Sequence, residues 1–294
     1  MFKWIFSPGY AQGVTWAILT AFVSVSNDVI TKFVGTRLDG IEISFFRFFF
    51  SMVTVLPFML QKGFPLFKTK QPALHFWRAL IGCAAIALFI YSLILLPFAD
   101  VNVLSYTQPL FFMPIAILFL REKVTANRWI AAAFGFMGIL CVMRLGSEAF
   151  TPLIFIPIGS TILFAMLDML AKKMVTIQEH TITMLFYFAL GTTLAALVPA
   201  IYVWKTPTMG ELFWLFCLGS GANLIQVCLF RAFAAADASA LVPFRYTELI
   251  FVIISGWLLF NEWPTLNTLL GAALIIGSTL YMTYMEMNKR HRKP

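Results

Sequence analysis

Charged residues are scarce in this sequence. Asp, Glu, Lys and Arg make up 12% of its 294 residues, whereas a soluble globular domain contains about 25%. Hydrophobic residues account for 61%, and the mean hydropathy is +0.87. This scarcity of charge excludes a soluble globular protein and indicates a polytopic membrane protein in contact with a lipid bilayer.

Residues that carry enzyme chemistry are also rare. There are three histidines and four cysteines, and the cysteines lie inside apolar runs without metal-ligand or disulfide spacing. No Gly-rich phosphate-binding loop ending in Lys-Ser or Lys-Thr occurs, which excludes an ATP-driven motor. We therefore expect no cofactor and no metal, and we predict that the protein is not an enzyme.

Long apolar runs, in contrast, fill the chain. A membrane-spanning helix needs about 20 mostly apolar residues, and apolar runs bounded by charge, Pro or Gly give ten candidates. The gaps between them are too short to hold a soluble domain. The candidates are residues 12–33, 41–60, 74–95, 99–120, 127–144, 152–172, 181–203, 211–234, 238–260 and 266–285.

The basic residues indicate how these spans are oriented. With ten spans and a cytoplasmic N-terminus, most lysines and arginines fall on the cytoplasmic side, as membrane insertion favours. Arg78 then belongs to the inner basic residues and Lys32 to the few outer ones. We expect both termini to be cytoplasmic. The net charge of +8 reflects this bias, so no nucleic-acid partner is expected.

The second half of the chain repeats features of the first. Matching residues recur at a constant offset, and five spans per half require the halves to have opposite orientations. Inverted repeats of this kind are typical of secondary transporters. We predict an all-α fold of two five-helix repeats, residues 1–145 and 146–294. The matching pairs are Asp28 and Asp168, Lys32 and Lys172, and Glu122 and Glu262.

The stretch from residue 236 to residue 262 carries charges inside an apolar span. Arg245 and Glu248 lie three residues apart, on one face of a helix, and follow Pro243, which tends to break a helix. A charge near the bilayer centre costs about 2.5–3.5 kcal/mol on insertion scales, so it faces a partner or a water-filled cavity. We predict that this stretch lines a polar path. A closed ion pair that locks the broken helix explains the same pattern.

Three more charged residues within predicted spans are candidates for the substrate site. Arg47, in a run of phenylalanines, suits a carboxylate as a forked donor. Alternatively, it is a structural partner of Glu42 or Asp28, or its side chain snorkels near the end of a span. Asp28 and Asp168 suit a cationic substrate or a coupled proton. Alternatively, each pairs with the lysine four residues further on.

The repeat plan resembles the EamA-type members of the drug/metabolite transporter superfamily. In that family, each five-helix repeat ends in a Pro-containing helix, a glutamate and a Gly-rich helix. Five short stretches, in the same order, more closely resemble the S-adenosylmethionine uptake transporters of rickettsia-like intracellular bacteria. They are residues 26–32 (SNDVITK), 35–38 (GTRL), 45–50 (FFRFFF), 164–168 (FAMLD) and 245–249 (RYTEL).

This resemblance implies a secondary transporter in a bacterial inner membrane. It would import S-adenosylmethionine by alternating access, either alone or in exchange for S-adenosylhomocysteine. An amino-acid, metabolite or drug exporter of the same superfamily is the alternative, and an intramembrane enzyme is a more distant one. The sequence sets no oligomeric state and is compatible with a monomer.

An adenosyl substrate would also need aromatic faces and amide hydrogen bonds. Polar residues within spans provide both, although such residues also hold helices together without any ligand. The candidates are Tyr91, Tyr106, Gln108, Asn223 and Gln226, with Tyr187, the repeat mate of Arg47, and Tyr246, which follows Arg245.

Overall fold

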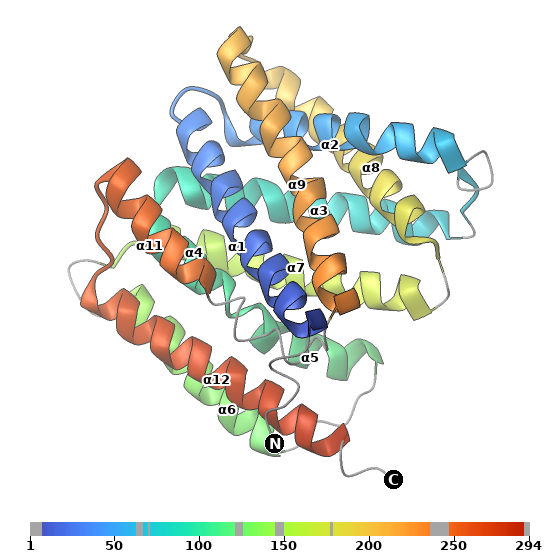
Figure 1. Ribbon diagram of the computed structural model, residues 1–294. Helices are drawn as coiled ribbons and strands as arrows, with labels where there is room; N and C mark the ends of the chain where they lie inside the picture. The colour runs from blue at the N-terminus through green and yellow to red at the C-terminus, as the bar shows by residue number, and fades with distance from the viewer. Residues whose placement is uncertain are drawn as a thin grey trace.

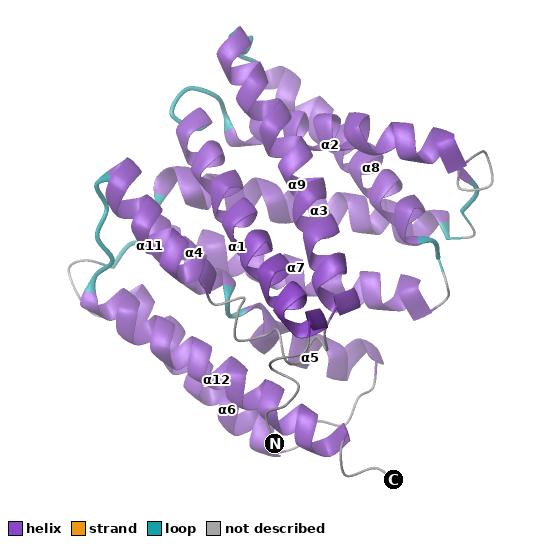
Figure 2. Cartoon of the chain, viewed as in Figure 1, coloured by secondary structure: helices purple, strands orange, loops and turns teal. Residues whose placement is uncertain are grey.

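The computed structural model describes residues 8–62, 67–69, 71–120, 126–144, 150–176, 179–235 and 247–290. Over these residues the chain is helical and has no strand (Figure 2). The elements are α1 (Pro8–Val34), α2 (Gly40–Lys62), α3 (Pro72–Leu95), α4 (Phe98–Ser105), α5 (Gln108–Leu120), α6 (Ala126–Met143), the 3-10 helix η3 (Pro152–Ile154), α7 (Phe155–Thr176), α8 (Thr181–Tyr202), α9 (Met209–Ala235), α11 (Thr247–Phe260) and α12 (Leu266–Arg290).

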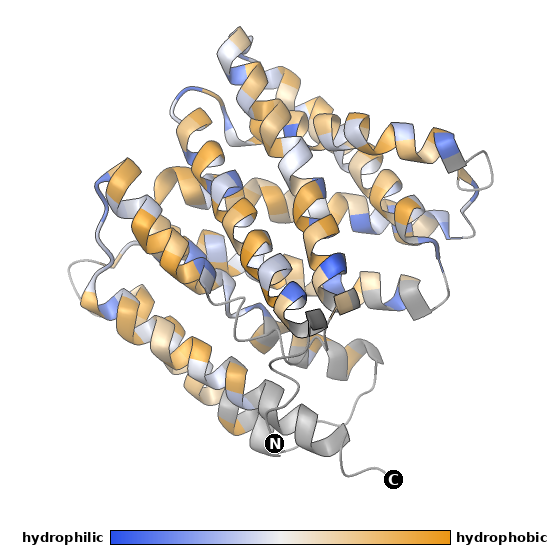
Figure 3. Cartoon of the chain, in the orientation of Figure 1, coloured by the Kyte–Doolittle hydropathy of each residue, from blue (hydrophilic) through white to orange (hydrophobic). Residues whose placement is uncertain are grey.

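Six segments of the described chain are long and apolar enough to cross a membrane. They lie in α1, α2, α3, α7, α8 and α9, and α6, α11 and α12 contain shorter apolar stretches. Hydrophobic residues predominate along the described helices (Figure 3). The prediction of an all-helical, multi-pass membrane protein is therefore confirmed.

The fourth predicted span, residues 99–120, is not one continuous helix. α4 ends at Ser105, and Tyr106 and Thr107 form a turn before α5 begins at Gln108. Pro109 has no backbone N–H to bond the carbonyl oxygen of Ser105, so a continuous helix would lose a bond here. Irregular backbone within a membrane bundle is tolerated where protein buries it or where it lines a cavity. In the ninth predicted span only α11 is described, and Pro243 lies outside the described residues.

Several of the main contacts between helices recur when the two halves are exchanged. We call two helices mates when the repeat relates one to the other, as it does α1 to α7 and α3 to α9. α1 packs against α9, and their mates α7 and α3 pack against each other. The contacts of α2 with α9 and of α1 with α11 likewise have counterparts in those of α8 with α3 and of α7 with α5. α2 and α6 each pack against their own mates, α8 and α12. Figure 1 shows α1 beside α9 and α6 beside α12. This exchange pattern is the one expected of an internal two-fold axis.

α6 and α12 run antiparallel and cross closely. Near the end of α6, the guanidinium of Arg144 donates to Thr265 Oγ1, just before α12, at 2.8 Å. Further along both helices, a Cβ added at Gly138 would lie 2.8 Å from the carbonyl oxygen of Gly271, and one added at Gly271 would lie 2.7 Å from that of Gly138. Only residues without a side chain allow this approach.

α4, in the fourth predicted span, and α11, in the ninth, also run antiparallel. Phe98 at the start of α4 packs on Phe260 at the end of α11, with ring centroids 5.5 Å apart. Val101 and Val252 meet further along the two helices. These two spans correspond to each other in the two halves, and an inverted repeat requires corresponding spans to run in opposite directions.

Candidate functional site

Asp28 is buried in the bundle, with 6% of its surface exposed. The side chain of Asn102 on α4 hydrogen-bonds its carboxylate, and Arg47 on α2 and Glu248 on α11 lie close enough for their charges to act on it. We call these four residues the Asp28 cluster. Three of its members were predicted from the sequence, and four different helices bring them together.

The pattern of α1 explains why Asp28 points inward. Ala17, Ala21 and Val25, spaced four residues apart, are all buried, and Asp28 continues this stripe three residues later. The stripe packs against α9 and its neighbours, so the carboxylate is withdrawn from lipid. A buried carboxylate is stable only with hydrogen bonds and opposite charge, which Asn102 and Arg47 supply.

Arg47 brings an unused donor to this cluster. Its Nη1 atom is buried and has no hydrogen-bond partner among the described residues. The backbone here is fixed by close packing on α9, because a Cβ added at Gly219 would lie 2.7 Å from the carbonyl oxygen of Arg47. A buried guanidinium nitrogen without a partner suits an anionic group of a ligand.

Asp168 is the centre of a second cluster. Gln108 Nε2 donates to its Oδ2 atom at 2.6 Å, and Arg78 on α3 attracts its charge. We call Arg78, Gln108 and Asp168 the Asp168 cluster. The basic-residue pattern counts Arg78 among the inner basic residues without a role in a site, and the structure places it within α3. The sequence offered one signal for this position, since Arg78 lies inside the predicted apolar run 74–95.

The two clusters correspond to each other through the repeat. Asp28 and Asp168 are mates, and Gln108 and Glu248 are separated by the same offset as the two aspartates. Each aspartate has a neighbour on a corresponding helix. Glu248 on α11 lies near Asp28, and Gln108 on α5, the mate of α11, bonds to Asp168. The clusters differ in access, because the side chain of Asp168 is exposed and that of Asp28 is not.

Other predicted residues hold the helices together. The hydroxyl of Tyr91 donates to Asp39 Oδ1 at 2.5 Å, beyond the end of α1. Asn223 on α9 accepts from Ser51 Oγ at 2.9 Å and donates to Thr54 Oγ1 at 2.6 Å, both on α2. These contacts join helices to helices or loops, as polar residues do in bilayers.

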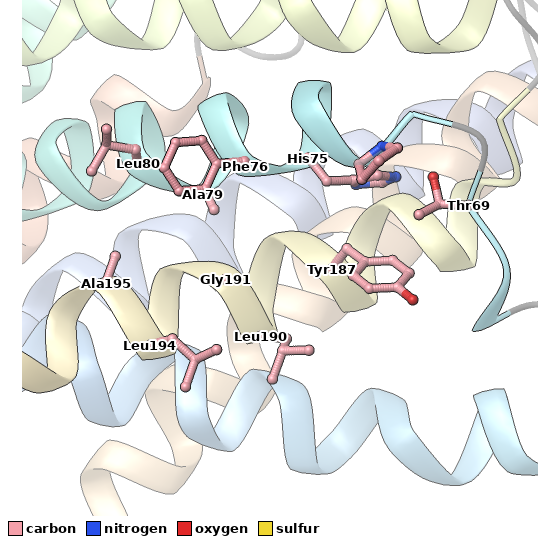
Figure 4. A pocket seen from close by; sticks show the side chains of 11 residues that line it. Thr69, His75, Phe76, Ala79, Leu80, Tyr187, Leu190, Gly191, Leu194 and Ala195 are labelled. Atoms are coloured by element: carbon pink, nitrogen blue, oxygen red, sulfur yellow. The ribbon is translucent and has the colours of Figure 1, made fainter.

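Tyr187 lies away from both clusters. Its hydroxyl donates to the carbonyl oxygen of Phe67 at 2.6 Å, and its ring packs 4.9 Å from that of His75. Both rings line a cavity of about 480 Å³ between α3 and α8 (Figure 4). Phe76 and Leu194, also on its walls, have exposed side chains, so this cavity opens at the outer surface of the bundle.

The remaining candidates are only partly placed. Tyr106 is half-buried in the turn between α4 and α5, and Gln226 is half-buried on α9. Arg245 and Tyr246 lie outside the described residues.

Lys32 does not pair with Asp28, which was the alternative explanation for this acid. Its Nζ atom donates to Glu262 Oε1 at 2.6 Å and to the carbonyl oxygen of Leu96 at 3.1 Å. The other oxygen of Glu262 accepts from the backbone N–H of Phe98 at 2.6 Å. This contact therefore joins the first half of the chain to the second. The side chain of Lys172, the mate of Lys32, is not among those that the structure describes.

Comparison with known proteins gives full-length matches. The EamA-like transporter family matches residues 11–144 and again residues 151–284. An S-adenosylmethionine uptake transporter of Rickettsia conorii is 40% identical over 285 residues, which cover 96% of this chain and 97% of that protein. A riboflavin transporter of Brucella anthropi is 30% identical over 281 residues, covering 90% and 95%. One protein of known crystal structure has the same fold, with a TM-score of 0.62, 15% identity, and coverage of 97% of this chain and 99% of that one.

Proposed function

The chain belongs to the EamA-like transporter family, and from this premise we propose that it imports S-adenosylmethionine across a bacterial inner membrane. The prediction of a transporter rather than an enzyme is confirmed by this membership. The proposed substrate is supported by the full-length similarity to a rickettsial protein of that name. The mechanism we propose is alternating access between two inverted halves, residues 1–145 and 146–294.

The proposed topology has ten spans with both termini in the cytoplasm. The bias of the basic residues supports the orientation. The antiparallel pairing of α6 with α12 and of α4 with α11 supports the inversion of the halves. In this orientation, Lys32 and Glu262 lie at the outer side and Asp168 lies toward the cytoplasm.

The Asp28 cluster is the observation that carries the proposed function. S-adenosylmethionine has a carboxylate, an ammonium group and a sulfonium group. The unpartnered nitrogen of Arg47 suits the carboxylate, and the carboxylates of Asp28 and Glu248 suit the two cationic groups. A charged side chain at this depth in the bilayer costs free energy unless a ligand or a permanent partner of opposite charge compensates it. We also propose Arg245 and Tyr246 for this site, because they lie three and two residues before Glu248 in the sequence.

The direct test is uptake of labelled S-adenosylmethionine into cells that express the protein. We expect saturable uptake that S-adenosylhomocysteine competes, and its loss in Arg47→Ala at matched membrane levels. Arg231→Ala is the control, because Arg231 stacks on Trp16, 4.8 Å from the ring centroid, and belongs to neither cluster. Exchange is tested by preloading the cells with S-adenosylhomocysteine, which should accelerate uptake.

Absence of uptake by well-expressed wild-type protein, with and without preloading, would overturn S-adenosylmethionine as the substrate. A panel of amino acids, drugs and riboflavin would then identify the class transported. Efflux of a member of that panel would favour the exporter alternative.

A further inference from the structure

We propose that Arg78, Gln108 and Asp168 form a second, inward-facing binding site for the amino-acid end of the substrate. We further propose that this site holds a cation less tightly than the Asp28 cluster does. The inference rests on the proposed function and deepens it, because it divides the transport path into an outer and an inner site. Four observations carry it.

The first observation is the convergence of three helices. Arg78 is on α3, Gln108 begins α5 directly after the turn at Tyr106 and Thr107, and Asp168 is on α7. The hydrogen bond of 2.6 Å between Gln108 Nε2 and Asp168 Oδ2 fixes one side of the carboxylate. The side chain of Asp168 is exposed. A ligand therefore has access to this carboxylate in the conformation described.

The second observation is how Arg78 is held. Its Nη1 atom donates to the carbonyl oxygen of Met184 at 3.0 Å, and its guanidinium lies 4.6 Å from the centroid of the Phe188 ring. Its Nε atom is buried and has no hydrogen-bond partner among the described residues. The guanidinium is thus fixed in direction and keeps a donor in reserve. A planar fork of this kind matches a carboxylate, which a lysine ammonium group cannot do.

The third observation is the match in charge. Arg78 and Asp168 are close enough for their opposite charges to attract. An α-amino acid carries a carboxylate and an ammonium group on the same carbon atom. The carboxylate would bind Arg78 and the ammonium group would bind Asp168, so that each charge of the ligand meets an opposite charge of the protein.

The fourth observation is the difference between the two clusters. Gln108 occupies in the second cluster the place that Glu248 occupies in the first, and both lie beside the corresponding aspartate. An amide has no net charge, so the second site lacks one carboxylate that would stabilise a sulfonium cation. It therefore binds S-adenosylmethionine more weakly and discriminates less against an uncharged thioether such as S-adenosylhomocysteine. This difference favours release of the cation on the inner side.

The experiment uses membrane vesicles of both orientations, which expose opposite faces of the full-length protein. Labelled S-adenosylmethionine exchange is measured in right-side-out and in inside-out vesicles, and the half-saturation concentration is taken for each face. Gln108→Glu gives the inner site the carboxylate that the outer cluster has. We expect the inner half-saturation concentration to fall relative to the outer one by about tenfold, which corresponds to about 1.4 kcal/mol. Gln61→Glu is the matched control, since Gln61 is exposed at the end of α2 and belongs to neither cluster.

A second variant keeps the test independent of one substitution. Arg78→Lys retains the charge but removes the fork, and it should raise the inner half-saturation concentration while the outer one changes little. A purely structural role for these residues would leave the ratio of the two concentrations unchanged in both variants, which would overturn the inference while transport persists. No transport by wild-type protein in either vesicle type would instead overturn the proposed function itself.

Discussion

Lys32 and Glu262 join the two halves of the protein through an ion pair with 2.6 Å between Nζ and Oε1. The lysine also lies over the rings of Phe98 and Phe260, at 5.9 Å and 5.1 Å from their centroids. Arg37 and Glu211 form a further ion pair between the halves. In the proposed topology all of these contacts are at the outer side, where they would hold the protein closed toward the outside.

Loss of the Lys32–Glu262 pair should open the outer side. In Glu262→Gln the acceptor is uncharged, so α1 and α11 are held together less strongly. A cysteine introduced at Val29 on α1, which packs against the buried cluster that contains Leu96 and Phe98, should then react several-fold faster with a membrane-impermeant thiol reagent added outside. The exchanged pair Lys32→Glu with Glu262→Lys should restore slow labelling. Equal labelling rates in all variants would contradict a closing role for the pair.

Glu248→Gln should make the charge of the Asp28 cluster resemble that of the Asp168 cluster, which has a glutamine at the corresponding position. With one carboxylate fewer beside Asp28, the half-saturation concentration for S-adenosylmethionine uptake should rise by about tenfold. The affinity for S-adenosylhomocysteine should rise relative to that for S-adenosylmethionine. Only the sulfonium cation of S-adenosylmethionine loses an attraction to the removed carboxylate, because the thioether of S-adenosylhomocysteine is uncharged. Glu179→Gln is the control, since Glu179 pairs with His75 at 3.5 Å outside both clusters. An unchanged competition ratio would remove Glu248 from the substrate site.

Gly271→Ala should destabilise the contact between α6 and α12. The added Cβ would lie 2.5 Å from Val142 Cγ2 and 2.7 Å from the carbonyl oxygen of Gly138. Overpacking of this kind costs about 1–3 kcal/mol. Gly277→Ala on the same helix is the matched control, because nothing lies within 4 Å of its added Cβ. Thermal unfolding of the two variants in detergent should show a lower Tm for Gly271→Ala alone.

Asn223→Ala should affect stability more than substrate recognition. The hydrogen bonds of its side-chain amide to Ser51 and Thr54 join α9 to α2. Interhelical hydrogen bonds of this kind contribute roughly 1 kcal/mol to stability. We expect a lower Tm and an unchanged half-saturation concentration at matched membrane levels, with the exposed Asn267→Ala as the comparison. A raised half-saturation concentration with an unchanged Tm would return Asn223 to the substrate site.

The sequence was sufficient to predict the helical membrane class, and it singled out Asp28, Arg47 and Glu248 as charges within apolar runs. Each of these inferences needs only local composition. Their meeting in one cluster depends on the rotation of each helix about its axis, which is set by packing between segments far apart in the chain. The partner of Lys32 illustrates this, because it lies 230 residues away.

The inward direction of the Arg78 side chain was not predicted, for a related reason. An arginine near the start of an apolar run is usually an interfacial anchor, and composition alone does not separate an anchor from a residue that points into the bundle. The carbonyl oxygen of Met184 and the ring of Phe188, both on α8, are what hold it inward. The break at Tyr106 and Thr107 was missed because the apolar character of residues 99–120 continues through it.

The recurrence of helix contacts when the two halves are interchanged has an energetic consequence. Several large interfaces between the halves come in corresponding pairs, as in the packing of α1 on α9 and of α7 on α3. A tilt that loosens one interface and tightens its counterpart converts the bundle into an arrangement with much the same inventory of contacts. Two such arrangements are nearly isoenergetic, so a ligand that prefers either by a few kcal/mol is enough to interconvert them.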